Sequence, residues 1–196
     1  MHDCIFSAHC VEQICDKSCP TYTETSYLLE RNNISLSNPV FNTAVQDLDR
    51  VISILNQSSG KFKVIVGDDT SAIAMLVTYC AICNNWQGSR LQCNVYNLKF
   101  SNHVDAIQKS WNYKNSPEAL EYEQIWSQTA KILIISNLDF VQFKDFQAQT
   151  LLNIIHNRKD GGLTTILVIP DPDKLIGSGS FFQRMKILFE GSIMRW

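Results

Sequence analysis

Short apolar runs alternate with longer amphipathic stretches from residue 61 onward. The apolar runs cover 62–66, 93–98, 131–135 and 164–169, and the first of them is β-branched. Such runs predict buried strands. The stretches between them predict helices over 72–83, 103–111, 117–126 and 145–157, the last stopped by Gly161-Gly162. Near-continuous apolar strands separated by helices predict an α/β fold with a parallel sheet covered on both faces.

Residues 21–60 have a different pattern. A short helix is expected around 23–29, and Asn32-Asn33 and Ser37-Asn38-Pro39 interrupt it as breaker signals. Apolar residues at helical spacing then predict an amphipathic helix; they are Phe41, Val45, Leu48, Val51, Ile52 and Leu55. We therefore divide the chain into a cysteine-rich head at 1–20, a helical connector at 21–60 and an α/β domain at 61–196.

Composition and charge exclude several classes of protein. Lys and Arg total 17 against 19 Asp and Glu, a net charge of −2, which argues against a strongly basic nucleic-acid binder but permits a local patch. No apolar run reaches the roughly 18 residues that a membrane-spanning helix needs. The first residues lack the basic and apolar regions of a secretory signal. We expect a cytoplasmic protein, where disulfides are rare.

Four of the seven cysteines lie in the head, separated by five, four and three residues: Cys4, Cys10, Cys15 and Cys19. Thiolates suit zinc or an iron–sulfur cluster. The closing Cys19-Pro20 pair is typical of ferredoxin-type runs and favours a [4Fe–4S] cluster. Zinc stays open, because His9 or His2 could replace one cysteine. The remaining alternative is four free thiols in a tail.

Two other groups of residues, the remaining cysteines and the histidines with serines, are not expected to form a catalytic or metal site. The Cys80-Ala81-Ile82-Cys83 stretch lies inside an apolar helical run rather than at a helix start, so we expect core packing, and Cys93 should be buried as well. The sequence also lacks a Gly-x-Ser-x-Gly motif, and its histidines and serines form no recognisable hydrolase triad.

The order of elements from the helix at Asp47 to Arg195 resembles the ATPase core of bacterial replicative-helicase loaders of the DnaC/DnaI type and of the related IstB transposition ATPases. The best match runs from Lys131 to Thr165. The resemblance implies an AAA+ P-loop fold and partners in a DNA-processing complex, such as a helicase or an active AAA+ ATPase. It also implies a zinc-binding N-terminal domain that docks on the helicase.

The catalytic positions depart from the family pattern. A P-loop needs glycines around the phosphates, a lysine for their charge and a hydroxyl for Mg²⁺. Here the loop keeps Gly67, Thr70 and Ser71, but Ile73 and Ala74 stand at the lysine and hydroxyl positions. Asp68 and Asp69 place negative charge where phosphate would bind.

The Walker-B acids are replaced as well. Ser136 and Asn137 follow the strand at 131–135, and the polar sensor position falls near Ile169-Pro170. Three elements have lost their chemistry together, so we expect neither ATP binding nor hydrolysis, and no enzyme activity.

Three arginines are candidate contacts to a partner or to DNA. Arg184 stands where the family keeps its inter-subunit arginine, Arg195 where it keeps the terminal sensor arginine, and Arg158 ends the best-matching stretch. An arginine finger acts on a neighbour's nucleotide, so a chain without ATPase activity could complete an active partner's site. The alternative is that Arg184 and Arg195 are ordinary surface residues.

These observations lead to three functional hypotheses. The first is a non-catalytic, loader-like subunit or adaptor in a DNA replication, transposition or mobile-element complex. The second is a nucleic-acid-binding module with an iron–sulfur or zinc head. Its binding to DNA or RNA should depend on the salt concentration. The third, a nucleotide-binding switch without hydrolysis, is opposed by Ile73 and the two aspartates.

Overall fold

The computed structural model describes residues 19–39, 41, 51–53, 55, 60–87, 92–111, 118–138, 144–170, 187–188 and 192–196, with the backbone alone for 118–123. Several predicted residues lie outside these ranges: Cys4, Cys10, Cys15 and Arg184. Within the described ranges, no helix is both long enough and apolar enough to cross a bilayer.

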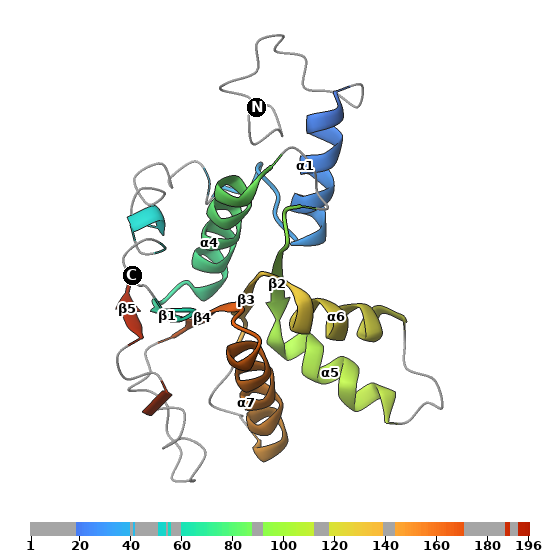
Figure 1. The fold of residues 1–196 in the computed structure, drawn as a ribbon, viewed down its shortest axis with the longest axis vertical. Helices are drawn as coiled ribbons and strands as arrows, with labels where there is room; N and C mark the ends of the chain where they lie inside the picture. Colours follow the sequence, from blue (N-terminus) through green and yellow to red (C-terminus); the bar gives the residue numbers. More distant parts are fainter. Residues whose placement is uncertain are drawn as a thin grey trace.

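A five-stranded parallel sheet forms the centre of the molecule (Figure 1). Its strands are β1 (Phe62–Val66), β2 (Val95–Lys99), β3 (Ile132–Ser136), β4 (Thr164–Ile169) and β5 (Ile193–Arg195), in the order β2-β3-β4-β1-β5. Every pairing is parallel, as predicted. The four strands expected from the apolar runs are confirmed. β5 was not predicted, because it has only three residues, two of them exposed.

Helices cover both faces of the sheet, which confirms the predicted α/β class. They are α1 (Pro20–Arg31), α4 (Thr70–Asn85), α5 (Phe100–Ser110), α6 (Glu118–Thr129) and α7 (Asp145–Asp160). In Figure 1, α1 and α4 lie on one side, and α5, α6 and α7 on the other. Alternate strand residues supply the two cores: Ile65 packs with α1 and α4, whereas Val64 and Val66 pack with α5 and α7.

Helix α1 packs in the same core as α4 and the sheet. Its Leu28 and Leu29 are buried in the same cluster as residues of α4. Its C-cap residue Asn32 accepts a 2.7 Å hydrogen bond from the Asn97 backbone N–H in β2. Arg31 donates to the Val95 carbonyl at 2.8 Å and lies 4.2 Å over the ring of Trp126. In the described residues, the chain before residue 61 therefore shares a core with the sheet.

The described cysteines of α4 and the chain before β2 are packing residues. Cys80 and Cys93 are buried and Cys83 is half-buried. Burial raises the pKa of Cys80 to about 12, and those of Cys83 and Cys93 to about 11. These thiols stay protonated at neutral pH, so they lack the thiolate character of a redox centre. The core-packing prediction is confirmed.

Arg158 joins α7 to the amino-terminal edge of the sheet. Its side chain is 1% exposed. It donates to the Ser127 and Ala130 carbonyls at 3.0 and 2.8 Å, and to the Thr164 carbonyl and Thr165 hydroxyl at 2.6 and 2.9 Å. Ser127 is in the last turn of α6, where carbonyls have no partner within the helix. Burial lowers the pKa of this guanidinium to about 10.

The expectation that Arg158 contacts a partner or DNA is therefore wrong. A buried guanidinium whose donors are held by internal carbonyls and a hydroxyl cannot reach an external phosphate or carboxylate. Its positive charge instead stabilises the carbonyl end of α6, where the helix dipole is negative.

Replacing Arg158 with methionine should destabilise the chain by about 3 kcal/mol, because three buried carbonyls lose their donor while the apolar volume is kept. Lys159→Met is the matched control, since Lys159 is the next residue on α7 and is exposed; it should change stability by less than about 0.5 kcal/mol. Urea unfolding of both variants measures the difference. Equal losses would contradict a structural role for Arg158.

Candidate functional site

The loop Gly67–Asp69 connects the carboxyl end of β1 to the first turn of α4. In α/β folds this position binds phosphate, because free backbone N–H groups at the helix start point outward and the helix dipole favours an anion. Gly67, Thr70 and Ser71, predicted as the remnant of a nucleotide loop, all lie here. What occupies this helix start decides whether a nucleotide can bind.

Asp69 occupies the helix start itself. It is the N-cap of α4, and its Oδ1 accepts a 2.9 Å hydrogen bond from the Ala72 N–H. Its carboxylate thus uses a donor that a phosphate would otherwise take, and its charge favourably offsets the helix dipole. A phosphate at this position would face a carboxylate already hydrogen-bonded to the helix, with Asp68 beside it.

Two apolar side chains close the space over Gly67. A Cβ atom on Gly67 would lie 2.4 Å from Cδ1 of Ile73 and 2.9 Å from Cβ of Trp196. Ile73, at the lysine position of the family pattern, is 2% exposed. The Trp196 N–H donates to the Val66 carbonyl at 2.7 Å, and the Gly67 N–H donates to the Ile169 carbonyl at 3.1 Å. The Gly67 N–H and the side of Gly67 where a Cβ atom would stand therefore both face other parts of the protein.

A neutral hydrogen-bond network lies where the Walker-B acids would be. Ser136, at the end of β3, is 2% exposed and its hydroxyl donates to Asn97 Oδ1 at 3.1 Å. Asn97 is itself held by Asn32, so the network runs from β3 through β2 to α1. Asn137 follows with a left-handed φ of 56°. Hydroxyl and amide groups bonded to each other are poor substitutes for the carboxylates that hold Mg²⁺ beside phosphates.

The remaining predicted residues fall at different places. Arg195 lies in β5, exposed and paired in register with Val66, so the structure brings it to the same edge as Gly67. Arg158 lies at the opposite edge. Cys19 is the half-buried N-cap of α1 and makes no side-chain capping bond. Because Pro20 begins the helix at a position where proline is favoured, the Cys19-Pro20 pair has an explanation that requires no cluster.

Two functional residues were not recognised from the sequence. Asp69 precedes a helical run at the spacing of an N-cap, so that signal was available, but its charge was interpreted only as repulsion of phosphate. Trp196 gives no local signal, because its contact with Gly67 joins positions far apart in the chain.

The comparisons with known proteins now bear on the fold. A scan against protein-family models and a search of curated proteins both find no match. Among solved structures, a replication initiator DnaA bound to AMPPCP and single-stranded DNA aligns with 92% of this chain at 14% identity and a TM-score of 0.54. A DNA replication initiation factor aligns with 87% at 15% identity and a TM-score of 0.55.

The chain shares the fold of these two structures over most of its length. Identities this low support the fold alone. The chain spans about half of each neighbour, 51% and 49% of their lengths. The parallel sheet with helices on both faces is shared, whereas the loop at Gly67 carries the substitutions described above.

Alanine at Gly67 should destabilise the chain by about 1–3 kcal/mol, because the new methyl group would overlap Ile73 and Trp196. Gly60→Ala is the control: the nearest atom to its Cβ is the Phe62 carbonyl oxygen at 3.5 Å, an ordinary contact. Urea unfolding measures the stability of both variants. A harmless Gly67→Ala would contradict the closed loop.

Proposed function

We propose that this chain is a non-catalytic, AAA+-like subunit or adaptor of a DNA-replication complex, related in role to helicase loaders. It contributes a rigid docking surface rather than nucleotide turnover. One observation carries the proposal: the phosphate position at the start of α4 is occupied by the chain's own Asp69 carboxylate, under a cover of Ile73 and Trp196.

The chemistry of the loop supports the absence of ATP hydrolysis. Phosphoryl transfer depends on electrostatic stabilisation by a lysine, backbone N–H groups and a carboxylate-held metal. Here the lysine position is an isoleucine, the Gly67 N–H donates to Ile169, and Ser136 belongs to a neutral network. Restoring one element would leave the other two missing.

The replication role is supported by the fold and by the names of its structural neighbours, one bound to AMPPCP and single-stranded DNA and the other a replication initiation factor. In our proposal the partner is a replicative helicase or an active AAA+ ATPase, and Arg195, exposed beside the closed loop, faces the site of that partner.

The first test is nucleotide binding by thermal shift. We expect ATP or AMPPCP at about 1 mM with Mg²⁺ to leave the Tm unchanged. A ligand at 100 times its Kd would instead add about 2.7 kcal/mol and raise the Tm by several degrees. A nucleotide-binding AAA+ initiator measured in parallel is the positive control. A shift in this chain, or phosphate release above the blank, would overturn the non-catalytic assignment.

The adaptor role requires a separate measurement. Mixed with the replicative helicase and with an active AAA+ ATPase from the same cell, the chain should co-elute with one of them in size-exclusion chromatography without added nucleotide. Separate elution from both would contradict the role even if no nucleotide binds.

The metal head is the last part of the proposal. Cys19 and the three cysteines outside the described residues would hold a [4Fe–4S] cluster or zinc, which would order a segment too short to form a core of its own. Anaerobic purification followed by metal analysis and an absorption spectrum should give about four irons with a visible charge-transfer band, or one zinc without colour. A chain carrying neither metal would refute the head.

A further inference from the structure

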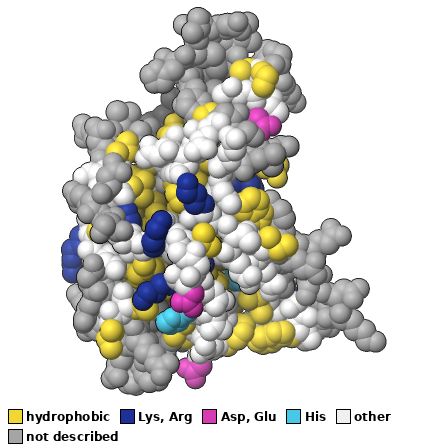
Figure 2. Space-filling model, in the orientation of Figure 1, with side chains coloured by type: hydrophobic (Ala, Val, Ile, Leu, Met, Phe, Trp, Pro, Cys, Tyr) yellow, Lys and Arg dark blue, Asp and Glu magenta, His cyan; other side chains and the backbone are white. Residues whose placement is uncertain are grey.

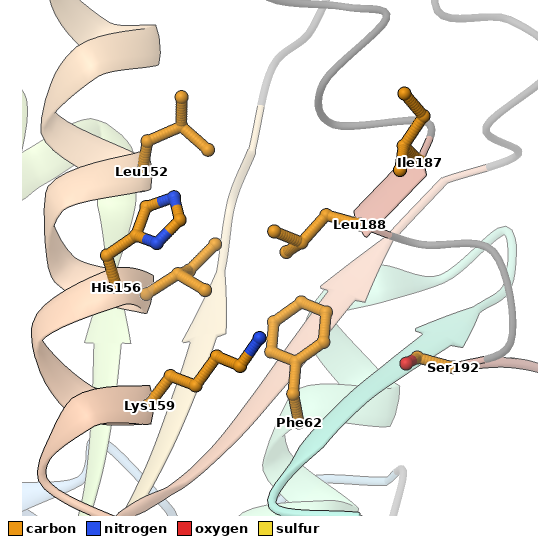
Figure 3. A pocket seen from close by; sticks show the side chains of 8 residues that line it. Phe62, Leu152, His156, Lys159, Ile187, Leu188 and Ser192 are labelled. Carbon is orange, nitrogen blue, oxygen red and sulfur yellow. The ribbon is translucent and has the colours of Figure 1, made fainter.

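An apolar groove opens at the amino-terminal edge of the sheet, on the side away from Gly67. It has a volume of about 620 Å³ and lies between α7, β1 and the residues Ile187, Leu188 and Ser192. Its described lining residues are Phe62, Leu152, Ile155, His156, Lys159, Ile187, Leu188 and Ser192. Figure 3 shows the side chains of α7 facing Phe62 and Leu188 across the groove.

The groove exposes apolar surface. Ile187 is 68% exposed, the largest exposure among the described large hydrophobic residues. Leu152 and Ile155 of α7 form the wall opposite it. Leu152 and Ile155 are buried, at 6% and 2% exposed, so Ile187 is the one highly exposed hydrophobic residue among the described residues that line the groove. A concave surface of this volume lined mainly by apolar residues is typical of a binding site.

Positive charge borders this apolar surface. Lys159 extends from α7 toward the Phe62 side of the groove in Figure 3, and His156 lies one turn before it. A second hollow shares Phe62, Ile155, Lys159 and Ser192 with the groove and continues it to Lys61. None of the described residues that line either hollow is acidic. On the face shown in Figure 2, several Lys and Arg side chains lie over the middle beside hydrophobic ones, and an Asp or Glu side chain lies next to the lowest of them.

Helix stabilisation explains only part of this charge. Lys159 is in the last turn of α7, where a cation offsets the helix dipole. Lys61 precedes a strand rather than ending a helix, so the same explanation does not apply to it. The helix dipole therefore accounts for the position of Lys159 but not for that of Lys61. What the two lysines share is their position beside the groove.

We propose that this groove binds an amphipathic segment of a partner protein that places apolar side chains against Leu152, Ile155 and Leu188 and carboxylates against Lys159 and Lys61. A second copy of this chain is a poor occupant, because a symmetric contact would bring the same cations together. A nucleic acid backbone has no apolar groups to fill the groove. The inference goes beyond the proposed function and involves neither nucleotide nor DNA, so each can fail without the other.

Two designed peptides of about 16 residues test the proposal. Both carry leucines at helical i, i+3, i+4 and i+7 spacing; the flanking positions are glutamate in one and lysine in the other. Fluorescence anisotropy with the full chain should show saturable binding of the glutamate peptide. The lysine peptide should bind at least about tenfold more weakly in low salt, and the difference should narrow as salt screens the charges.

Matched surface variants distinguish peptide binding at the groove from nonspecific binding elsewhere on the surface. Ile187→Glu should weaken the glutamate peptide about tenfold. Its control is Ile125→Glu, on α6, where Ile125 is 58% exposed. Lys159→Glu should weaken the glutamate peptide and strengthen the lysine peptide. Its control is Lys109→Glu, another exposed lysine in the last turn of a helix. Circular dichroism checks that all four variants remain folded.

The outcomes are distinct. Charge-selective binding that is lost in the two groove variants and kept in both controls supports the proposal. Binding of neither peptide, equal binding of both, or equal losses in groove and control variants would overturn it. A concentration-dependent dimer broken by Ile187→Glu would also overturn it, because the occupant would then be a second copy.

Discussion

The buried guanidinium of Arg158 is the contact on which the arrangement at the amino-terminal edge of the sheet depends. It holds the carbonyl end of α6, the start of β4 and the body of α7 together with four hydrogen bonds. The buried polar residues that the structure describes include no carboxylate, and the carbonyls at the end of α6 and the start of β4 supply the negative end of the interactions of this cation. By fixing α7, Arg158 also fixes Leu152, Ile155 and Lys159, which form one wall of the groove.

The two edges of the sheet have opposite character. At the carboxyl edge, the chain closes its own phosphate position with Asp69, Ile73 and Trp196. At the amino edge, lysines border an open apolar groove. One of its structural neighbours, at 14% identity, is bound to AMPPCP. In this chain the loop after β1 is covered by its own side chains, and the accessible groove lies at the other edge of the sheet. This division agrees with a protein that works by contact with partners.

Strands could be predicted from the sequence where their own residues carry the hydrophobic pattern of a buried strand. β1 and β4 form as predicted, because continuous β-branched runs can only be buried strands in this context. The strand expected from residue 93 begins at Val95, since Cys93 is buried but precedes the ladder. β5 could not be predicted, because its pairing with β1 depends on a distant partner rather than on its own three residues.

The same distinction separates the site predictions. The sequence alone shows Ile73, Ser136 and Asn137 at the positions where the resemblance implies a P-loop lysine and Walker-B acids. The burial of Arg158 could not be predicted in this way, because a charged residue near a helix end is typical of a surface. Two of the carbonyls that hold it, those of Ser127 and Ala130, come from the end of α6 and the residue that follows it, about thirty residues earlier. The closure over Gly67 likewise required three segments to be placed together.

The Asn32 amide has a consequence for how this sheet meets other chains. β2 is an outer strand, and the outward backbone groups of such a strand ordinarily offer a template for the strand of another molecule. Here the Asn97 N–H and the Val95 carbonyl are already engaged by Asn32 and Arg31. Intermolecular strand addition at β2 would have to break these bonds first. Growth of a fibril by strand addition needs an accessible edge strand on both sides of the sheet. At β2 the C-terminal end of α1 covers that edge.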